Sequence, residues 1–153
     1  MAVRERQATF ADALWVWWNM RDIDHEEASA VTHWPVLLTM LWGVLFTEVI
    51  ALHGDGVPIA LYGVRPCRED RRVGLIWMLS THRIADHKRD VFEACEAYVR
   101  RCARRYRALG NAVYVKNAMA MRFVQRLGFE IVLKPQTVRG KLFYPIVRMS
   151  CAD

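Results

Sequence analysis

The sequence of 153 residues predicts an α+β fold, a mixed sheet with helices on both faces. Apolar runs that suit strands alternate with stretches of helical periodicity along the whole chain. The turn His53-Gly-Asp-Gly56 joins two apolar runs in the manner of a β-hairpin. No linker, repeat or low-complexity tract divides the chain. We therefore expect a single domain over 1–153 with a sizeable core.

The N-terminal part predicts a short strand at 2–6 followed by helices. Thr9 and Asp12 have the spacing of a capping box, which predicts a helix from there to about Asn19. Leu14 and Trp18 form the apolar stripe of that helix. The acidic stretch MRDIDHEEASA at 20–30 predicts a second helical piece. We expect a solvated acidic face there, since neighbours along a helix diverge too much to build a metal site or an acceptor-amine pocket.

The segment 34–52 is apolar enough to suggest a membrane span. Glu48 interrupts it and the glycine-rich turn follows directly. We therefore expect a helix that begins near Trp34-Pro35, is buried, and runs into a buried strand, with no membrane span. The first ten residues lack the apolar region of a signal peptide, so none is expected.

The second half of the chain alternates between strands and helices. It predicts strands at 73–80 and 112–115, helices at about 90–107 and after Asn117, and two last strands, EIVLK and KLFYPIVRMS, around a turn at 136–140. The first of these helices has an apolar stripe of Phe92, Cys95, Val99, Cys102 and Tyr106. Leu109-Gly110 is expected to end it. Asn117 is expected to cap the next helix, and Gly128 to end it in the left-handed conformation, with Phe129 packing back.

The net charge of +6 is concentrated in one block. Residues 65–107 hold twelve Arg or Lys and six Asp or Glu, while the rest of the chain is balanced. This basic block could face a phosphate-bearing cofactor, nucleic acid or an acidic partner, or it could be a solvated helix face. For nucleic acid we expect only non-specific contact, through Arg100, Arg101, Arg104 and Arg105.

The four cysteines have no CxxC spacing and no paired histidines. We therefore expect neither a metal site nor a disulfide, and a reducing compartment.

The residues Asn117, Ala120, Leu127, Gly128 and Phe129 have the spacing of the last core helix in the GCN5-related N-acetyltransferases, the GNAT family. The chain resembles this family over nearly its whole length. The resemblance implies a three-layer sandwich whose central, mostly antiparallel sheet has splayed middle strands. Within the fold the chain is more closely similar to the small GNAT-like internal virion proteins of short-tailed phages. The segments that carry this second likeness are MRDIDHEEASA, LIWMLST, ARRYRAL and NAVYVKNAMAMRFVQRLGF.

In active members of this family, acetyl-CoA lies between the two splayed strands, here 73–80 and 112–115. Its pyrophosphate rests on backbone N–H groups in a turn of the form Gln/Arg-x-x-Gly-x-Gly/Ala. Arg83 stands for the first basic residue of that turn, but Asp86 and Lys88 occupy the glycine positions. If a coenzyme A site is retained, the resemblance assigns it to Leu79, Thr81, Arg83, Lys88, Arg89 and Asn117.

The catalytic groups of the family are also replaced. Val124 stands where a tyrosine often protonates the leaving thiolate, and LIWMLST contains no carboxylate. His82 is the remaining candidate for a catalytic base, and the alternative is an ordinary loop histidine. We therefore expect a degenerate site with no cofactor, and a protein that acts by contact with other virion proteins, in the virion and the host cytoplasm. The alternative is an active acetyl-CoA-dependent N-acetyltransferase.

Overall fold

The computed structural model describes residues 3–150 and divides the chain into two compact units. The first unit comprises Met1–Gly63 and Trp77–Ala94, and the second comprises Val64–Ile76 and Cys95–Asp153. Two strands and one helix therefore contribute residues to both units.

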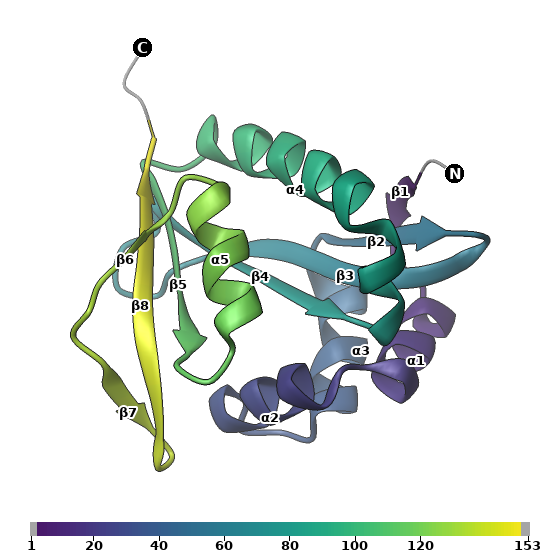
Figure 1. Cartoon of the computed structure of the whole chain (residues 1–153), viewed down its shortest axis with the longest axis horizontal. Coiled ribbons are helices and arrows are strands. Elements are labelled where there is room, and N and C mark those ends of the chain that lie inside the picture. Colours follow the sequence, from purple (N-terminus) through teal and green to yellow (C-terminus); the bar gives the residue numbers. More distant parts are fainter. Residues whose placement is uncertain (1–2, 151–153) are drawn as a thin grey trace. The chain divides into compact units, whose positions relative to one another are not determined.

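The eight strands that the structure describes follow the hydrogen-bonded order β1-β2-β3-β4-β5-β8-β6, with β7 beside β8 (Figure 1). Their bounds are β1 Arg4–Gln7, β2 Val49–Gly54, β3 Val57–Pro66, β4 Val73–Ser80, β5 Ala108–Tyr114, β6 Glu130–Ile131, β7 Gln136–Val138 and β8 Lys141–Met149. The pairing of β4 with β5 is parallel. The pairings β1–β2, β2–β3, β5–β8, β6–β8 and β7–β8 are antiparallel. The predicted α+β class with a mostly antiparallel sheet is confirmed.

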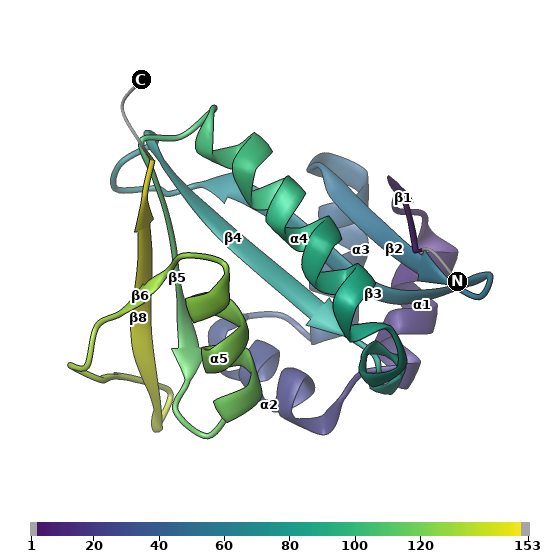
Figure 2. The ribbon, with the colours of Figure 1, turned by 45° about the horizontal axis from the view of Figure 1, so that its top comes forward.

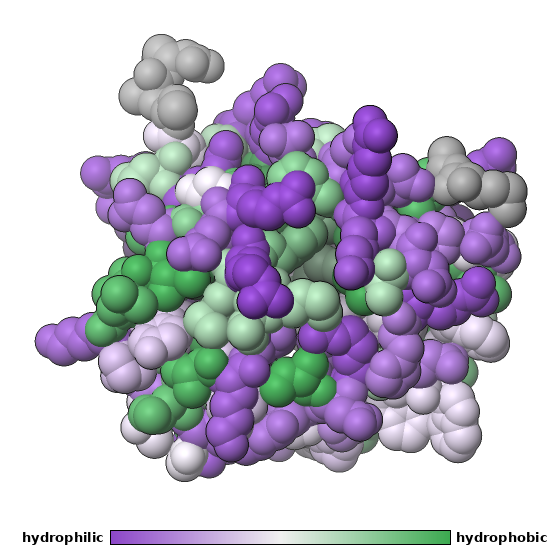
Figure 3. Space-filling view, viewed as in Figure 1, coloured by the Kyte–Doolittle hydropathy of each residue, from purple (hydrophilic) through white to green (hydrophobic). Residues whose placement is uncertain are grey.

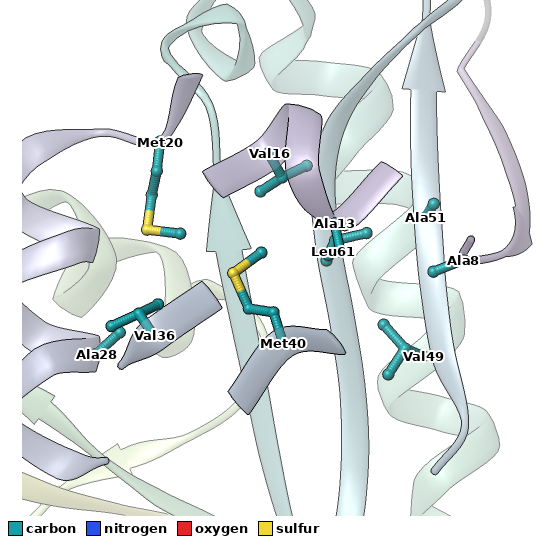
Figure 4. Packing of buried hydrophobic residues seen from close by; sticks show 10 residues of the cluster. All are labelled: Ala8, Ala13, Val16, Met20, Ala28, Val36, Met40, Val49, Ala51 and Leu61. Carbon is teal, nitrogen blue, oxygen red and sulfur yellow. The ribbon is translucent and has the colours of Figure 1, made fainter. Parts of the chain in front are cut away.

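Three helices of the first unit precede the hairpin of β2 and β3: α1 Phe10–Asn19, α2 Asp22–Val31 and α3 Val36–Phe46. The capping box of α1 is present, since the Thr9 hydroxyl accepts from Asp12 N–H at 3.3 Å and Asp12 Oδ2 accepts from Thr9 N–H at 2.9 Å. Ala13 and Val16 of α1 and Met40 of α3 pack into one apolar cluster with residues of β2 and β3 (Figure 4). Both helices therefore cover the same face of the sheet.

The β2–β3 hairpin turns at Asp55 and Gly56, as predicted. Their φ angles are +54° and +81°, the left-handed pair that a two-residue hairpin turn requires. After β4, the 3₁₀ helix η1 (His82–His87) runs directly into α4 (Lys88–Ala103), whose first residues belong to the same unit.

Two expectations for the apolar N-terminal helices are wrong. Leu14 and Trp18 point away from the core, with exposed fractions of 47% and 79%. The expected burial of the helix at 34–46 holds for only one side of α3, because its outer residues Leu38, Trp42, Leu45 and Phe46 are exposed. The apolar residues buried on the inner sides are Ala13 and Val16 of α1 and Val36 and Met40 of α3. Among the described residues no single helix is long and apolar enough to cross a membrane, and α2 and α3 pass that requirement only together, bent by 76°.

In the second unit β5 pairs with β8 over its full length, and α5 (Ala118–Arg126) lies beside β5 (Figures 1 and 2). Asn117 caps α5 as predicted, since its Oδ1 accepts from Ala120 N–H at 3.2 Å. Gly128 ends it at φ +89°, and the N–H groups of Gly128 and Phe129 each donate at 3.0 Å to carbonyls of the last turn. This is a Schellman ending, and it confirms the predicted stop.

The predicted end of the preceding helix is wrong. The helix α4 stops at Ala103, and Leu109 and Gly110 lie in β5, opposite Arg148 and Val147 of β8. Arg107 N–H donates to Arg72 O at 2.8 Å. The chain is therefore already hydrogen-bonded beside the start of β4 when β5 begins at Ala108, two residues before Gly110. Pairing with β8 therefore overrides the local stop signal. The predicted final turn is also shorter than expected: residues 136–138 form β7, and the chain reverses at Arg139-Gly140.

The cysteines of α4 face the core as predicted. Cys95 and Cys102 are buried and no disulfide joins the described cysteines. Cys151 lies outside the described residues.

Candidate cofactor site

The segment between β4 and α4, where the resemblance places a phosphate cradle, is folded as a helix. Thr81 precedes η1, and Ile84 N–H donates to Thr81 O at 3.2 Å. In a 3₁₀ helix each later N–H is taken by the carbonyl three residues before it. The backbone N–H groups at the start of η1, those of His82 and Arg83, are therefore the ones left for an anion.

The two residues at the glycine positions stand on this continuous helical stretch. Asp86 is in η1 and Lys88 is the first residue of α4, and both are exposed. A pyrophosphate that rests on main-chain N–H groups needs a turn without side chains, because a Cβ holds it away. The side chain of Asp86 also adds a negative charge. Side chains on a helical backbone therefore occupy the two positions at which the family has glycines.

A carboxylate of the same unit already faces the basic residue of this segment. Asp55 Oδ2, from the β2–β3 turn, lies 3.6 Å from Arg83 Nη2 and 3.2 Å from His87 Nε2. The His87 contact is an ion-pair distance without hydrogen-bond geometry. The ring of His87 is buried against Gly54, where an added Cβ would lie 2.9 Å from Nε2. The hairpin turn thus places a carboxylate within 4 Å of Arg83 and of His87.

The other predicted cofactor residues are used in different ways. Thr81 is fully buried and its hydroxyl donates to Ile59 O at 3.2 Å, while Leu79 packs half-buried against the core cluster. Arg89 Nε donates to Glu93 Oε1 at 3.0 Å on an exposed surface, and this hydrogen bond raises the pKa of Arg89. His82, the candidate base, is exposed at the first position of η1. Asn117 belongs to the second unit, where it caps α5.

One carboxylate of the acidic stretch 20–30, where the sequence predicts a solvated face, is buried at the end of β4. Asp24 of α2 is buried, and its Oδ2 accepts from the N–H of Ser80 at 3.0 Å and from its hydroxyl at 2.6 Å. Arg21 Nη1 lies 3.8 Å from Asp24 Oδ1, and Arg21 N–H donates to Ser80 O at 3.1 Å. The expectation of a solvated face is therefore wrong for Asp24. Asp24 lies four residues before Ala28, which places both on the same face of the helix. This spacing to a small apolar residue is the feature of the sequence that could have indicated the burial of Asp24.

In the second unit the parallel pairing of β4 with β5 covers three residue pairs, Val73 to Leu75 with Ala108 to Gly110. The Asn111 side-chain amide then donates to Ile76 O. The Ile76 carbonyl, which follows the last residue pair of the ladder, thus accepts from a side chain and not from a backbone N–H of β5. The β4–β5 ladder thus ends at Leu75 and Gly110, before the end of either strand.

The basic residues at 100–105 do not form one helix face. Arg100 bonds Glu96 at 3.4 Å on α4, and Arg101 lies over the Tyr98 ring at 5.3 Å. Arg104 and Arg105 follow the helix end, and the guanidinium of Arg105 lies 5.7 Å from the Tyr106 ring centroid. Hydrophilic side chains, in purple, are interspersed with green hydrophobic ones on the face in Figure 3.

No group of three or more His, Cys, Asp or Glu in residues 3–150 is placed to hold a metal ion.

Solved structures share this fold over nearly the full length of both chains. A GCN5-related N-acetyltransferase from Kribbella flavida matches with a TM-score of 0.68 and 21% identity, covering 97% of this chain and 98% of that one. The yncA protein of Salmonella typhimurium, solved with its cofactor acetyl-CoA, matches with a TM-score of 0.70 and 16% identity, covering 100% and 96%. AAC(6')-Ib, in complex with ribostamycin and coenzyme A, matches with a TM-score of 0.71 and 18% identity, covering 97% and 94%.

No protein-family model matches the sequence, and no curated protein is similar to it in sequence. The chain has the GNAT fold. At these identities the likeness concerns the fold, and the site has to be judged on its own residues.

Proposed function

We propose that this GNAT-fold chain acts by protein contact and that its coenzyme A site is degenerate. The observation that carries the proposal is the position of Asp55, whose carboxylate faces Arg83 and His87. A pyrophosphate at that position would meet a like charge. Two unit charges 4 Å apart repel by about 4 kcal/mol at a protein surface, and less with salt present. The contacts that should attract the cofactor are already made within the chain.

The neighbouring residues support the same conclusion. The helical fold of 82–87 takes up backbone N–H groups that a phosphate cradle would offer, and Asp86 adds a second negative charge. On α5, Val124 has no proton to give to a leaving thiolate. Binding and proton transfer are both weakened, and the two defects are independent.

The basis for a location is the resemblance of segments such as MRDIDHEEASA and NAVYVKNAMAMRFVQRLGF to internal virion proteins of short-tailed phages. We propose that the chain is made in the host cytoplasm and is carried in the phage particle with other virion proteins as partners. Particles purified on a density gradient after nuclease treatment should contain the protein. Its recovery only in the soluble lysate would contradict this assignment.

The second candidate is an active acetyl-CoA-dependent N-acetyltransferase, with His82 as base. Two observations favour it: the β4–β5 ladder ends at Leu75, and the solved structures with this fold include two that hold acetyl-CoA or coenzyme A. Incubation of the protein with isotope-labelled acetyl-CoA and a cell lysate would show a transferred label. His82→Ala should then abolish the transfer.

Calorimetric titration with coenzyme A separates the two candidates. We expect no binding at 1 mM ligand and a melting temperature that changes by less than about 1 °C, because tight binding would stabilise the fold by mass action. A GNAT enzyme that binds coenzyme A serves as the positive control. A dissociation constant below about 100 µM for the unmodified chain, about 5.5 kcal/mol of binding free energy, would overturn the contact-only proposal.

A further inference from the structure

The helices α1 and α3 present a large apolar surface to solvent, which is called here the α1/α3 outer face. It consists of Phe10, Leu14, Trp15 and Trp18 on α1 and of Leu38, Trp42, Leu45 and Phe46 on α3, with exposed fractions of 41–79%. A helix that is apolar all round is normally buried on all sides. Here α3 contains no charged residue, and its outer half is open to solvent.

The two exposed stripes face the same way. Ala13 and Val16 of α1 and Met40 of α3 pack into one cluster with Leu61 of the sheet (Figure 4). The outer residues recur at helical spacing on the opposite side of each helix, at 10, 14 and 18 and at 38, 42 and 45. Since α1 and α3 contact each other, the stripes lie next to one another.

The exposed area has the size of a protein interface. At the roughly 200 Å² that an aromatic side chain can bury, the five aromatic side chains of the face expose about 600 Å². The three leucines extend it further. The largest apolar patch of a monomer is typically about 300–600 Å², and a standard protein interface covers about 800 Å² on each partner.

The absence of charge on this face favours a second copy of the chain. The one charged residue of α1 and α3, Asp12, is buried and bonds Arg6 Nη2 at 2.9 Å, so the outer stripes carry no charge. In a two-fold interface the same patch is buried on both copies and residues near the axis meet their own equivalents, which aromatic and leucine side chains tolerate and like charges do not.

The surrounding sequence disfavours an anionic membrane surface as the occupant. Residues 22–64, which include α3, contain no Lys or Arg, and six Asp or Glu. Arg4, Arg6 and Arg21 flank α1, and two of these, Arg6 and Arg21, lie within 4 Å of Asp12 and Asp24. Helices that lie on membranes carry basic residues on their polar side, because these bind anionic lipid head groups.

We propose that two copies of this chain associate through their α1/α3 outer faces in a two-fold symmetric dimer. The interface buries the aromatic residues of both copies. Each copy carries a net charge of +6, so the copies repel each other at long range. Dimerisation is therefore stronger at 0.5 M than at 0.05 M salt, in contrast to contacts made by ion pairs. The proposal holds whether or not coenzyme A binds.

Analytical ultracentrifugation of the full chain between 1 and 100 µM tests this. The unmodified chain should be dimeric, and Trp18→Arg with Trp42→Arg should raise the dissociation constant at least tenfold. The matched control is Leu133→Arg, an exposed apolar residue of the second unit (81% exposed), which should leave it unchanged. Circular dichroism checks that the variants fold, and Trp18→Arg alone serves if the double variant does not.

Two results would overturn the proposal. One is a monomer throughout the concentration range, or a dimer that Leu133→Arg weakens as much as the tryptophan changes do. The other is a monomer that sediments with phosphatidylcholine–phosphatidylserine vesicles and loses that binding in the double tryptophan variant, which would assign the face to a membrane.

Discussion

The Asp24 carboxylate of α2 holds Ser80 at the end of β4 through two hydrogen bonds to one oxygen, from the N–H at 3.0 Å and from the hydroxyl at 2.6 Å. These bonds join residues 56 positions apart in the sequence. They fix α2 to the strand that leads into η1. One buried carboxylate therefore links α2 to the end of β4.

Replacement of Asp24 by Ala should destabilise the protein by about 2–4 kcal/mol, because it leaves two buried donors of Ser80 unsatisfied. Urea denaturation followed by circular dichroism measures this. Asp22→Ala, an exposed position at the start of the same helix, is the control and should change the free energy of unfolding by less than about 0.5 kcal/mol. Equal effects at both positions would show that the hydrogen bonds to Ser80 contribute little.

Replacement of Asp55 by Asn should make binding of inorganic pyrophosphate and of coenzyme A detectable at 1 mM ligand, where the unmodified chain is expected to show none. It removes the charge that faces Arg83 and His87, and Asn tolerates the φ of +54° at this turn. Calorimetric titration of both ligands measures the gain. The control is Asp70→Asn, which removes a charge from another turn and should have no effect. If Asp55→Asn changes neither affinity, the carboxylate is not what excludes the phosphate.

Replacement of Gly128 by Ala should destabilise the protein by about 1–2 kcal/mol through its φ of +89°, and further through a Cβ placed 3.0 Å from Arg148 Nε. Gly140→Ala is a matched control, since Gly140 has a φ of +77° and an added Cβ there meets nothing within 4 Å. The difference between their thermal unfolding free energies isolates the contact with Arg148. A larger loss at Gly140 would contradict this account.

The Asp70 carboxyl should titrate far below an ordinary aspartate. Hydrogen bonds from the Arg72 side chain at 2.9 and 3.0 Å, and from its backbone N–H at 3.0 Å, lower the pKa of Asp70 to about 2. Because the folded pKa is depressed, the stabilisation is present above the unfolded pKa of about 4 and is lost as the pH falls through about 2. Carbon-detected NMR titration measures the pKa, and Arg72→Gln should return it toward 4. A midpoint near 4 in the unmodified chain would show that the contact does not persist in solution.

Local signals in the sequence predict local structure well. Thr9 with Asp12, and Asn117 with Gly128, identify the ends of α1 and α5 because each cap is formed by residues within one turn of the helix. The predicted helix end at Leu109-Gly110 is wrong because Gly110 pairs with Val147 of β8, which is distant in the sequence and decides the conformation of this segment.

The orientation of apolar helices and the site itself depend on distant residues. An apolar stripe such as Leu14 and Trp18 predicts a helix, but α1 is apolar on several sides and the sheet selects the side with Ala13 and Val16. The resemblance to the GNAT family identified Arg83 and the missing glycines. It could not place Asp55 against Arg83, because that contact depends on how the hairpin folds over η1.

The stretch without Lys or Arg has a practical consequence for detecting this protein. Trypsin cleaves after those residues except before proline, so α2, α3, β2 and β3 leave the digest as one long apolar peptide that runs past Arg65-Pro66 to Arg68. Such a long apolar peptide is poorly recovered, whereas residues 73–83 and 90–100 leave as tryptic peptides of eleven residues each. Detection of the protein after trypsin therefore depends on peptides outside 22–68, and digestion at acidic residues, for which 22–64 offers six sites, is needed to cover α2 and α3.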